Sequence, residues 1–433
     1  MILLILLFSL SFALTIFSTA HGLGFWLVLM VIHGFLVDRF GDIAVHIPMY
    51  CGILICLVIL IRGQWKGLHT WIVGLFVSLA IGMLVAAIFG LNFNVSLTGS
   101  FLYLKNFALV LVIAGCVRSS QEIRILILYC LGALTFGALL ACYQKITGSY
   151  SVASIYQQRA GGLRADPNDT AMLLLAGVPI AYYWFNRRPE ISLKILSLAS
   201  LGLILIGLVL TGSRGGFLAT SFVLAVLYLR KPTLPKTAMG VVMVLVAVAF
   251  APTTFKERIT SLFTGVEKYG SSSIEKRGKL LLTGVEVFLD NVIVGVGVGN
   301  FAAGYMNHIS ESTVGGGSKN AISNSQNVRG AAHNLYLEFF VENGILTGII
   351  FITVLWKAIM GLLALKEELP FKGMRHYSMG FMLAVSLSGM LFAGLFLSQG
   401  KNPVLWFMIG LGYAAHHIQA KNISKKTVSL HGK

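Results

Sequence analysis

The segment 331–344, Ala-Ala-His-Asn-Leu-Tyr-Leu-Glu-Phe-Phe-Val-Glu-Asn-Gly, contains the best candidate for acid–base chemistry in this chain, His333. The segment closes a long polar insert that begins near Pro252, and it opens an apolar run that continues to Leu365. An imidazole with an ordinary pKa of about 6.5 can accept a proton near neutrality. His333 is therefore a candidate base at the point where a polar segment enters a membrane.

Helical periodicity would divide this segment into two stripes. The first begins with His333 and continues through Leu337, Phe340 and Gly344, whereas the second comprises Asn334, Glu338 and Glu342. An imidazole at the head of an apolar stripe is placed to act at the membrane surface. His308 is a weaker competitor, because it lies in a predicted loop.

Arg214 is the first candidate for binding an anion. It lies in Thr211-Gly-Ser-Arg214-Gly-Gly, a very short turn between two apolar runs. A guanidinium group binds phosphate oxygens in a bidentate manner. The alternative is an interfacial arginine that reaches lipid head groups. We favour the functional interpretation, because an arginine in a short outward turn opposes the usual charge bias of membrane proteins.

Arg277 is the second anion-binding candidate. Residues 275–290 have helical periodicity, with a polar stripe and an apolar stripe. Arg277 heads the apolar stripe, whereas Lys276 and Lys279 belong to the polar one. This position favours a pocket-facing arginine over a surface arginine paired with Glu275 or Asp290.

Arg164 is a third and weaker anion contact. It precedes Asp166-Pro-Asn-Asp169, an ordinary turn in which Asp169 or Thr170 is expected to be the N-cap of the next helix. Capping explains the acidic residues of this turn, but it does not explain the arginine.

The composition predicts an all-α polytopic membrane protein. Of 433 residues, 56% are hydrophobic and only 11% are charged, against about 25% charged in soluble domains. Apolar runs reach the roughly 20 residues that a membrane-spanning helix needs. We expect twelve spans near 2–36, 43–61, 71–90, 101–117, 123–143, 170–186, 193–210, 214–229, 237–251, 344–365, 377–398 and 402–417. The first is interrupted by His21-Gly22-Leu23-Gly24, and two short helices there would make the count thirteen.

Charges separate the loops into two sets. Basic residues gather in alternate loops, which the positive-inside rule assigns to the cytoplasm: Arg62/Lys66, Arg118/Arg124, Arg187/Arg188/Lys194, Arg230/Lys231/Lys236, Lys366/Lys372/Arg375 and Lys421/Lys425/Lys426. The insert 252–343 has eight basic and eight acidic residues and is neutral. The net charge of +17 therefore belongs mainly to the inner face, which predicts contact with membrane lipids and no nucleic acid.

These patterns divide the chain into four parts. We expect nine transmembrane helices in 1–251, a long outward-facing loop with amphipathic helices in 252–343, three further spans in 344–417 and a basic cytoplasmic tail in 418–433. The first twenty residues resemble a signal sequence without its basic start, and they are predicted to be a retained span.

Other chemical templates fail. The five cysteines lie in or beside apolar runs, and no Cys/His cluster has metal-ligand spacing, so neither a disulfide nor a zinc site is expected. Gly295, Gly297 and Gly299 lack the strand–turn–helix context of a dinucleotide site. An ordinary turn is the better interpretation.

Three motifs in order resemble the O-antigen ligase family, which shares a core domain with the Wzy-type O-antigen polymerases. They are Thr-Gly-Ser-Arg214-Gly-Gly, then Arg277 with Phe288-Leu-Asp-Asn-Val-Ile-Val-Gly-Val-Gly-Val-Gly-Asn-Phe301, then His333-Asn-Leu-Tyr-Leu-Glu with Glu-Asn-Gly-Ile-Leu-Thr-Gly348. The motifs cover about 160–350. Asn291-Val292 departs from the family, because many relatives have a proline there.

The resemblance implies a glycosyltransferase of the bacterial inner membrane, with its active site facing the periplasm. The donor would be a glycan on undecaprenyl diphosphate and the acceptor a sugar of lipid A-core, in a metal-independent, inverting reaction without a cofactor. His333 would be the catalytic histidine, Arg214 and Arg277 the essential arginines, and Arg164 a looser match. The alternatives are a polymerase of the same superfamily and an anion transporter that uses Arg214 as its binding charge.

Overall fold

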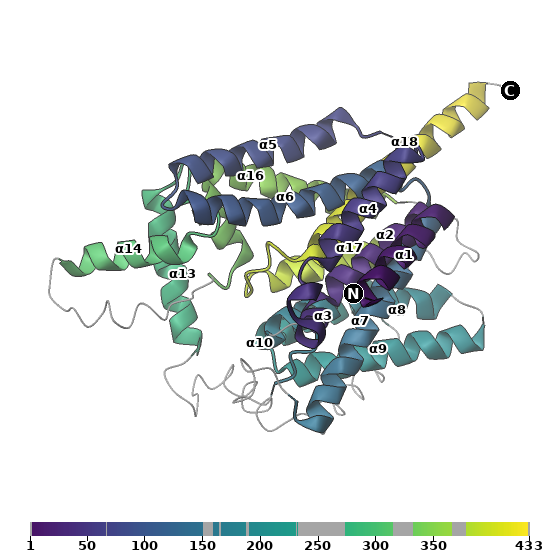
Figure 1. Cartoon of the computed structure of the whole chain (residues 1–433), viewed down its shortest axis with the longest axis horizontal. Coiled ribbons are helices and arrows are strands. Elements are labelled where there is room, and N and C mark those ends of the chain that lie inside the picture. Colours follow the sequence, from purple (N-terminus) through teal and green to yellow (C-terminus); the bar gives the residue numbers. More distant parts are fainter. Residues whose placement is uncertain are drawn as a thin grey trace.

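The computed structural model describes residues 2–65, 67–149, 159–163, 166–187, 190–230, 232, 273–314, 332–365 and 378–431. These residues form helices and connecting turns without any strand, so the predicted all-α class is confirmed (Figure 1). The helices are α1 Ile2–Phe17, α2 Thr19–Val31, α3 His33–Phe40, α4 Ile47–Ile61, α5 Thr70–Phe89, α6 Phe93–Cys116, α7 Ser120–Thr147, α8 Pro167–Arg187, α9 Ile191–Thr211, α10 Arg214–Arg230, α13 Ser273–Asp290, α14 Phe301–Val314, α16 Leu335–Ala364, α17 Met379–Ala393 and α18 Pro403–His431, with a short 3-10 turn at Gly41–Ala44.

The predicted count of twelve spans is not confirmed. Within the described residues, five helices are long and apolar enough to cross a membrane, namely α5, α6, α7, α9 and α16. A sixth results if α2 and α3, which are bent by 59° at Ile32, are taken as one span. Shorter apolar helices include α4 and α17, and the predicted span 237–251 lies outside the described residues. The chain is thus a helical membrane protein whose full number of spans stays a prediction.

The break in 2–36 is not where the glycines suggested. Gly22 and Gly24 lie inside α2, and the chain leaves the helix at Ser18 and again at Ile32. A Cβ on Gly22 would approach Thr15 Oγ1 to 2.3 Å, and one on Gly24 would approach the Tyr129 ring to 2.4 Å. These glycines therefore allow neighbouring helices to approach closely instead of ending the helix.

The centre of the bundle is formed by α8 and α18. From Thr170 to Ala181 every residue of α8 is buried, and a helix that is apolar on all sides must be covered on all sides. The largest buried aromatic group surrounds Trp406 of α18, whose ring centroid lies 5.0 Å from that of Phe107 and 6.2 Å from that of Phe351. This rigid interior fixes the helix ends on which the site is built.

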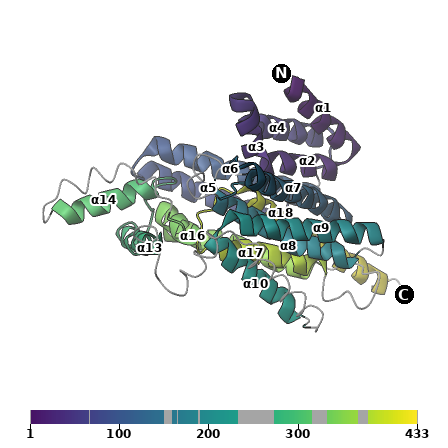
Figure 2. The same cartoon turned by 90° about the horizontal axis from the view of Figure 1, so that it is seen from below.

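One end of the bundle, which we call the site end, is connected by contacts between loops. The N–H of Leu91 donates to the carbonyl of Val296 at 2.9 Å, and the N–H of Leu335 donates to that of Gly394 at 2.7 Å. Figures 1 and 2 both show α13 and α14 at this end and the C-terminus at the other. The Arg214, Arg277 and His333 segments all belong to the site end.

At the opposite end, which we call the basic end, the stacked rings of His69 and His417 are 4.2 Å apart. The Arg118 guanidinium donates to the Gly67 carbonyl there, and Arg230 lies over Phe381 at 4.7 Å. Basic and candidate-site loops therefore lie at opposite ends of the same helices.

Candidate functional site

His333 lies immediately before a helix and not on one, so the predicted stripe through Leu337, Phe340 and Gly344 is wrong at its first member. Its φ is +50°, a left-handed conformation that is unusual for a residue other than glycine. Asn334 is the N-cap of α16, and its Oδ1 accepts from the N–H groups of Tyr336 and Leu337 at 3.0 Å. His333 therefore belongs to the turn that leads into α16 and not to the helix itself.

The second predicted stripe faces the interior of the molecule. Glu342 is only 2% exposed, and one carboxylate oxygen each of Glu338 and Glu342 is buried without a hydrogen-bond partner. The backbone N–H groups of Gly299 and Phe301 lie within hydrogen-bond reach of the Glu342 carboxyl. Burying the carboxyl groups of Glu338 and Glu342, one turn apart, costs free energy unless neighbouring groups compensate for it. This turn of α16 therefore depends on the residues that pack around it.

The glycine-rich turn from Gly295 to Gly299 packs around this part of α16. The N–H groups of Val296 and Gly297 donate to the carbonyls of Val341 and Glu342 at 2.9 and 3.0 Å. Gly344 has φ +74°, which breaks α16 where the sequence predicted a span to begin. A Cβ on Gly344 would lie 2.1 Å from the Ile293 carbonyl oxygen, so only glycine fits. The turn is structural, as the sequence indicated.

Charges converge on His333 from two other segments. Burial lowers the pKa of the half-buried imidazole, the positive charge of Arg277 lowers it further, and the negative charge of Asp166 opposes both. Arg277 and Asp166, which are 111 residues apart in the sequence, therefore both act on His333. The net result is a lowered pKa, so the imidazole of His333 stays neutral at a pH where a free imidazole would be protonated.

Arg277 is half-buried in the first part of α13. The predicted helix 275–290 is confirmed as Ser273–Asp290. A small apolar cluster fixes this helix to the start of α16, comprising Val287, Val296, Phe301, Ala332 and Val341. The cluster thus fixes the helix that bears Arg277, whose charge acts on His333.

Arg214 is the first residue of α10 and is half-buried. Its turn is held from below by Arg159, a buried arginine that the sequence analysis did not single out. Arg159 Nε donates to the Thr211 carbonyl at 2.7 Å, and its Nη2 donates to Asn168 Oδ1 at 2.9 Å. The Gly212 backbone has φ +57°, which lets the chain turn directly over Arg159.

The Asp-Pro-Asn turn is capped differently from the prediction. Asp166, and not Asp169 or Thr170, is the capping residue, because its Oδ1 accepts from the N–H of Asn168 at 2.7 Å and α8 begins at Pro167. Asp169 instead accepts a hydrogen bond from Gln399 Nε2. Arg164, the third predicted anion contact, lies outside the described residues.

The segment 394–402, which follows α17, connects the two halves of the site. On one side its Gly394 and Leu395 carbonyls accept from the Leu335 N–H and the Asn334 Nδ2, at 2.7 and 3.2 Å. On the other side Gln399 binds Asp169, and a Cβ on Gly215 would touch Phe396 at 3.1 Å. The Arg214 turn and the His333 turn therefore rest on one support.

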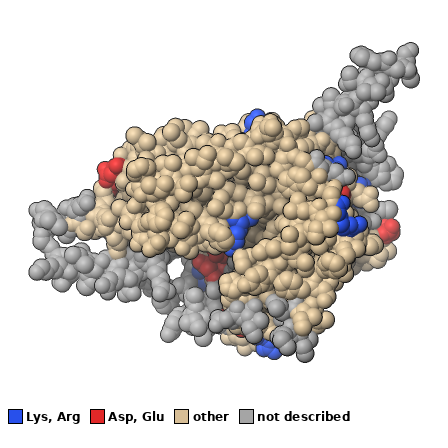
Figure 3. Space-filling model, turned by 45° about the horizontal axis from the view of Figure 1, so that its top comes forward, with Lys and Arg blue, Asp and Glu red and all other residues tan. Residues whose placement is uncertain are grey.

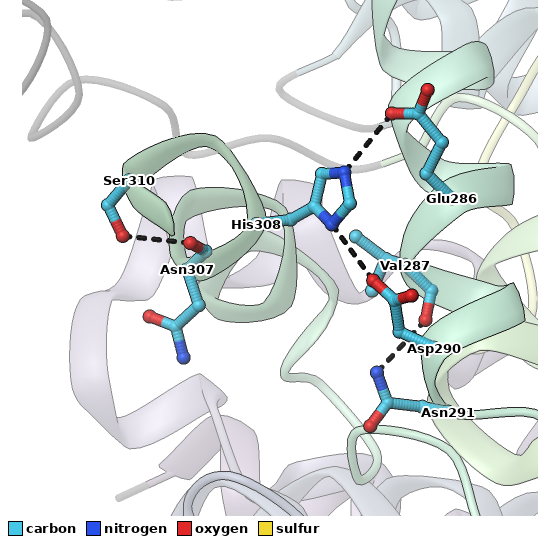
Figure 4. Close-up of polar contacts among 7 residues, drawn as sticks. All are labelled: Glu286, Val287, Asp290, Asn291, Asn307, His308 and Ser310. Atoms are coloured by element: carbon cyan, nitrogen blue, oxygen red, sulfur yellow. Dashed lines mark hydrogen bonds and ion pairs between the residues drawn. The ribbon is translucent and has the colours of Figure 1, made fainter. Parts of the chain in front are cut away.

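A further histidine, His308, is already engaged by two carboxylates. Figure 4 shows it on α14 between two residues of α13, with Nε2 at 3.2 Å from Glu286 and Nδ1 at 2.9 Å from Asp290. Both ring nitrogens are occupied, so His308 is a poor base. It joins α14 to α13.

One face of the described part of the molecule is mostly uncharged. In Figure 3 one face is nearly all tan, with basic and acidic side chains next to each other at a hollow near its centre. Among the residues that the structure describes, no three His, Cys, Asp or Glu side chains are placed to hold a metal ion.

Fold and site together define an all-helical membrane protein with an imidazole and two arginine-bearing segments at one end. Residues 199–352 match the model of the O-antigen ligase family, so the resemblance seen in the sequence is confirmed over this segment. The match extends from α9 into α16 and includes Arg214, Arg277 and His333. It supports a function of the O-antigen ligase or polymerase type in general. No curated protein matches the chain.

Proposed function

We propose that this protein is a glycosyltransferase that moves a glycan from undecaprenyl diphosphate to lipid A-core at the periplasmic face of the bacterial inner membrane. The observation that carries the proposal is the influence of Arg277 and Asp166 on His333, at the end of the bundle that also bears the Arg214 turn. The O-antigen ligase match over 199–352 supports the same class of reaction.

His333 acts as the general base. Its lowered pKa keeps the imidazole neutral near pH 7, so a ring nitrogen is free to accept the proton of an acceptor hydroxyl. The hydroxyl oxygen then attacks the anomeric carbon from the face opposite the diphosphate, which inverts that centre. The imidazolium that results is stabilised by the negative charge of Asp166.

Arg214 and Arg277 hold the diphosphate. As the bond from the anomeric carbon to the phosphate oxygen breaks, its electron pair leaves with the lipid diphosphate, and negative charge builds on that oxygen. Guanidinium groups fixed before the reaction stabilise this charge without reorganisation. In this proposal the leaving group needs neither a metal nor a cofactor. Arg164 would add a third cation.

The distribution of charge supports the orientation. Arg62, Arg118 and Arg230 lie at the basic end, opposite Arg214 and His333. The positive-inside rule then puts the basic end in the cytoplasm and the site end in the periplasm.

The decisive experiment is transfer by the purified protein in lipid vesicles that contain a polyprenyl-diphosphate-linked glycan. Addition of lipid A-core should give a product in which the glycan is joined to lipid A-core, and His333→Ala should give none. A ladder of longer glycans formed without lipid A-core would instead identify a polymerase. Movement of an anion across the vesicle membrane, unchanged in His333→Ala, would identify a transporter.

A further inference from the structure

Helix α13 presents three different faces. The first packs against α16: a Cβ on Gly284 would lie 2.8 Å from Leu337, and the rings of Phe288 and Phe340 are 5.9 Å apart, edge to face. Val287, on the same face, is buried in the small apolar cluster. This face needs no partner beyond the chain itself.

The second face is polar and is occupied by α14. Glu286 and Asp290, one turn apart, both contact His308 of α14 (Figure 4). Lys279 and Thr283 fall on the same face by helical spacing. This polar face is therefore the one that contacts water.

The third face is apolar and exposed. It consists of Leu281, Leu282, Val285 and Leu289, whose spacing places them between the other two faces. Leu282 is 67% exposed and Leu289 is 64% exposed. Four large apolar side chains on one face of a helix that also has a charged face are typical of a helix that lies in a membrane interface.

The exposed face is continuous with the membrane-facing surface of the bundle. Ile293, just after α13, is 74% exposed and adjoins Gly344, and the N–H of Ile345 donates to the Val292 carbonyl at 2.8 Å. Leu346 and Ile349 follow on α16, both exposed, in a helix that is apolar enough to span a bilayer. The apolar surface thus extends from a membrane span onto α13.

The orientation of α13 fits this position. Figures 1 and 2 show it lying across the direction in which α5, α6 and α16 run, at one end of the bundle. A helix perpendicular to the spans lies parallel to the membrane plane.

We propose that α13 lies in the membrane interface, with its third face inserted among the acyl chains of the bilayer lipids. Arg277, which is one turn before Leu281, is then held at the depth of the lipid head groups. This last consequence rests on the proposed function, because a diphosphate attached to a membrane lipid would lie at that depth.

The test uses a leucine analogue with a photoreactive diazirine, introduced into the full-length chain at Leu289 or Leu282. The matched control carries the analogue at Lys279, on the polar face. Each protein is reconstituted in vesicles of phosphatidylethanolamine and phosphatidylglycerol and irradiated, and adducts are identified by mass spectrometry. We expect about fivefold more phospholipid adducts at 289 and 282 than at 279.

Equal, low phospholipid labelling at all three positions would overturn the proposal, since it would place the third face in water. Adducts to a second copy of the chain would overturn it as well, because the face would then be a protein interface. The readout does not depend on catalysis. A normal lipid pattern in a protein without transfer activity would therefore support the membrane position and contradict the proposed function.

Discussion

The two candidate arginines rest on supports of different kinds. The Arg214 turn lies over Arg159, which is 9% exposed. The turn itself includes Thr211 and Ser213, which are both buried. Arg277 instead sits on α13, which is attached through a small apolar cluster and through the exposed contacts of His308. Buried, directional hydrogen bonds fix a geometry more tightly than a few apolar contacts do. We infer that the Arg214 half is preformed and that the Arg277 half can adjust.

The largest effect is expected at His333, on which the charges of Arg277 and Asp166 both act. His333→Ala removes the base, and transfer should fall by about 10²–10⁴-fold. His308→Ala, which removes an imidazole that two carboxylates already occupy, is the matched control. Activity is measured with the purified variants in vesicles, after their expression and folding are compared. Wild-type turnover in His333→Ala would remove the base from the proposal.

The comparison between the supports is tested by changing each arginine to lysine. Arg214→Lys should lose about 10²-fold in kcat/KM, because an ammonium group on a fixed turn cannot reproduce a bidentate fork. Arg277→Lys should lose about tenfold, because α13 can shift to bring the charge nearer. Equal losses would show that the two supports do not differ in rigidity.

A stability experiment examines the support of the Arg214 half directly. Arg159→Gln leaves the Thr211 carbonyl and Asn168 without their guanidinium donor, which should cost about 2–4 kcal/mol and lower the thermal midpoint in detergent. Arg39→Gln, at an exposed arginine remote from the site, should leave the midpoint unchanged. An unchanged midpoint in Arg159→Gln would mean that the turn is held by other contacts.

The pH dependence of transfer should report the charges around His333. Activity falls with decreasing pH as the imidazole is protonated, and its lowered pKa places that fall below the usual range. Arg277→Gln removes a positive charge, raises the pKa and moves the fall to higher pH. Asp166→Asn removes a negative charge and moves it to lower pH. Profiles of kcat/KM that shift in the same direction in both variants would contradict the arrangement.

The smallest effect is expected at the contact between α13 and α14. His308→Gln loses two exposed contacts with carboxylates, together worth at most about 1 kcal/mol, so transfer should change by less than about fivefold. Proteolysis of the purified protein should show whether α14 is released. A loss as large as that of Arg277→Lys would mean that His308 fixes the arginine.

Much of the fold could be predicted from the sequence, because the composition of a helical membrane protein identifies its fold class. The apolar runs gave the class, and the periodicity of 275–290 gave α13. The positions of the helix breaks, at Ser18 and Ile32 instead of at Gly22 and Gly24, could not be predicted, because a glycine that ends a helix and one that admits a neighbouring helix look alike in the sequence. The contacts of Gly22 with Thr15 and of Gly24 with Tyr129 distinguish them.

The site was partly accessible for a related reason. His333, Arg214 and Arg277 stand out as charged groups among apolar runs, and the structure describes all three at the site end. Their supports do not stand out. Arg159, Gln399 and the segment 394–402 act through backbone carbonyls and amides, and pairs such as Gln399 and Asp169 are 230 residues apart. A single sequence contains no signal for such a pair.

The segment 394–402 also has a consequence for biogenesis. It follows Asp169 and Asn334 in the chain, so these two residues lack their common partner until 394–402 has been synthesised. A chain that ends before Gly394 contains the arginines and the histidine. It lacks the contacts of Gly394, Leu395 and Gln399 that connect the two turns. Synthesis in this order means that the common support of the two turns forms only after α17 has been made.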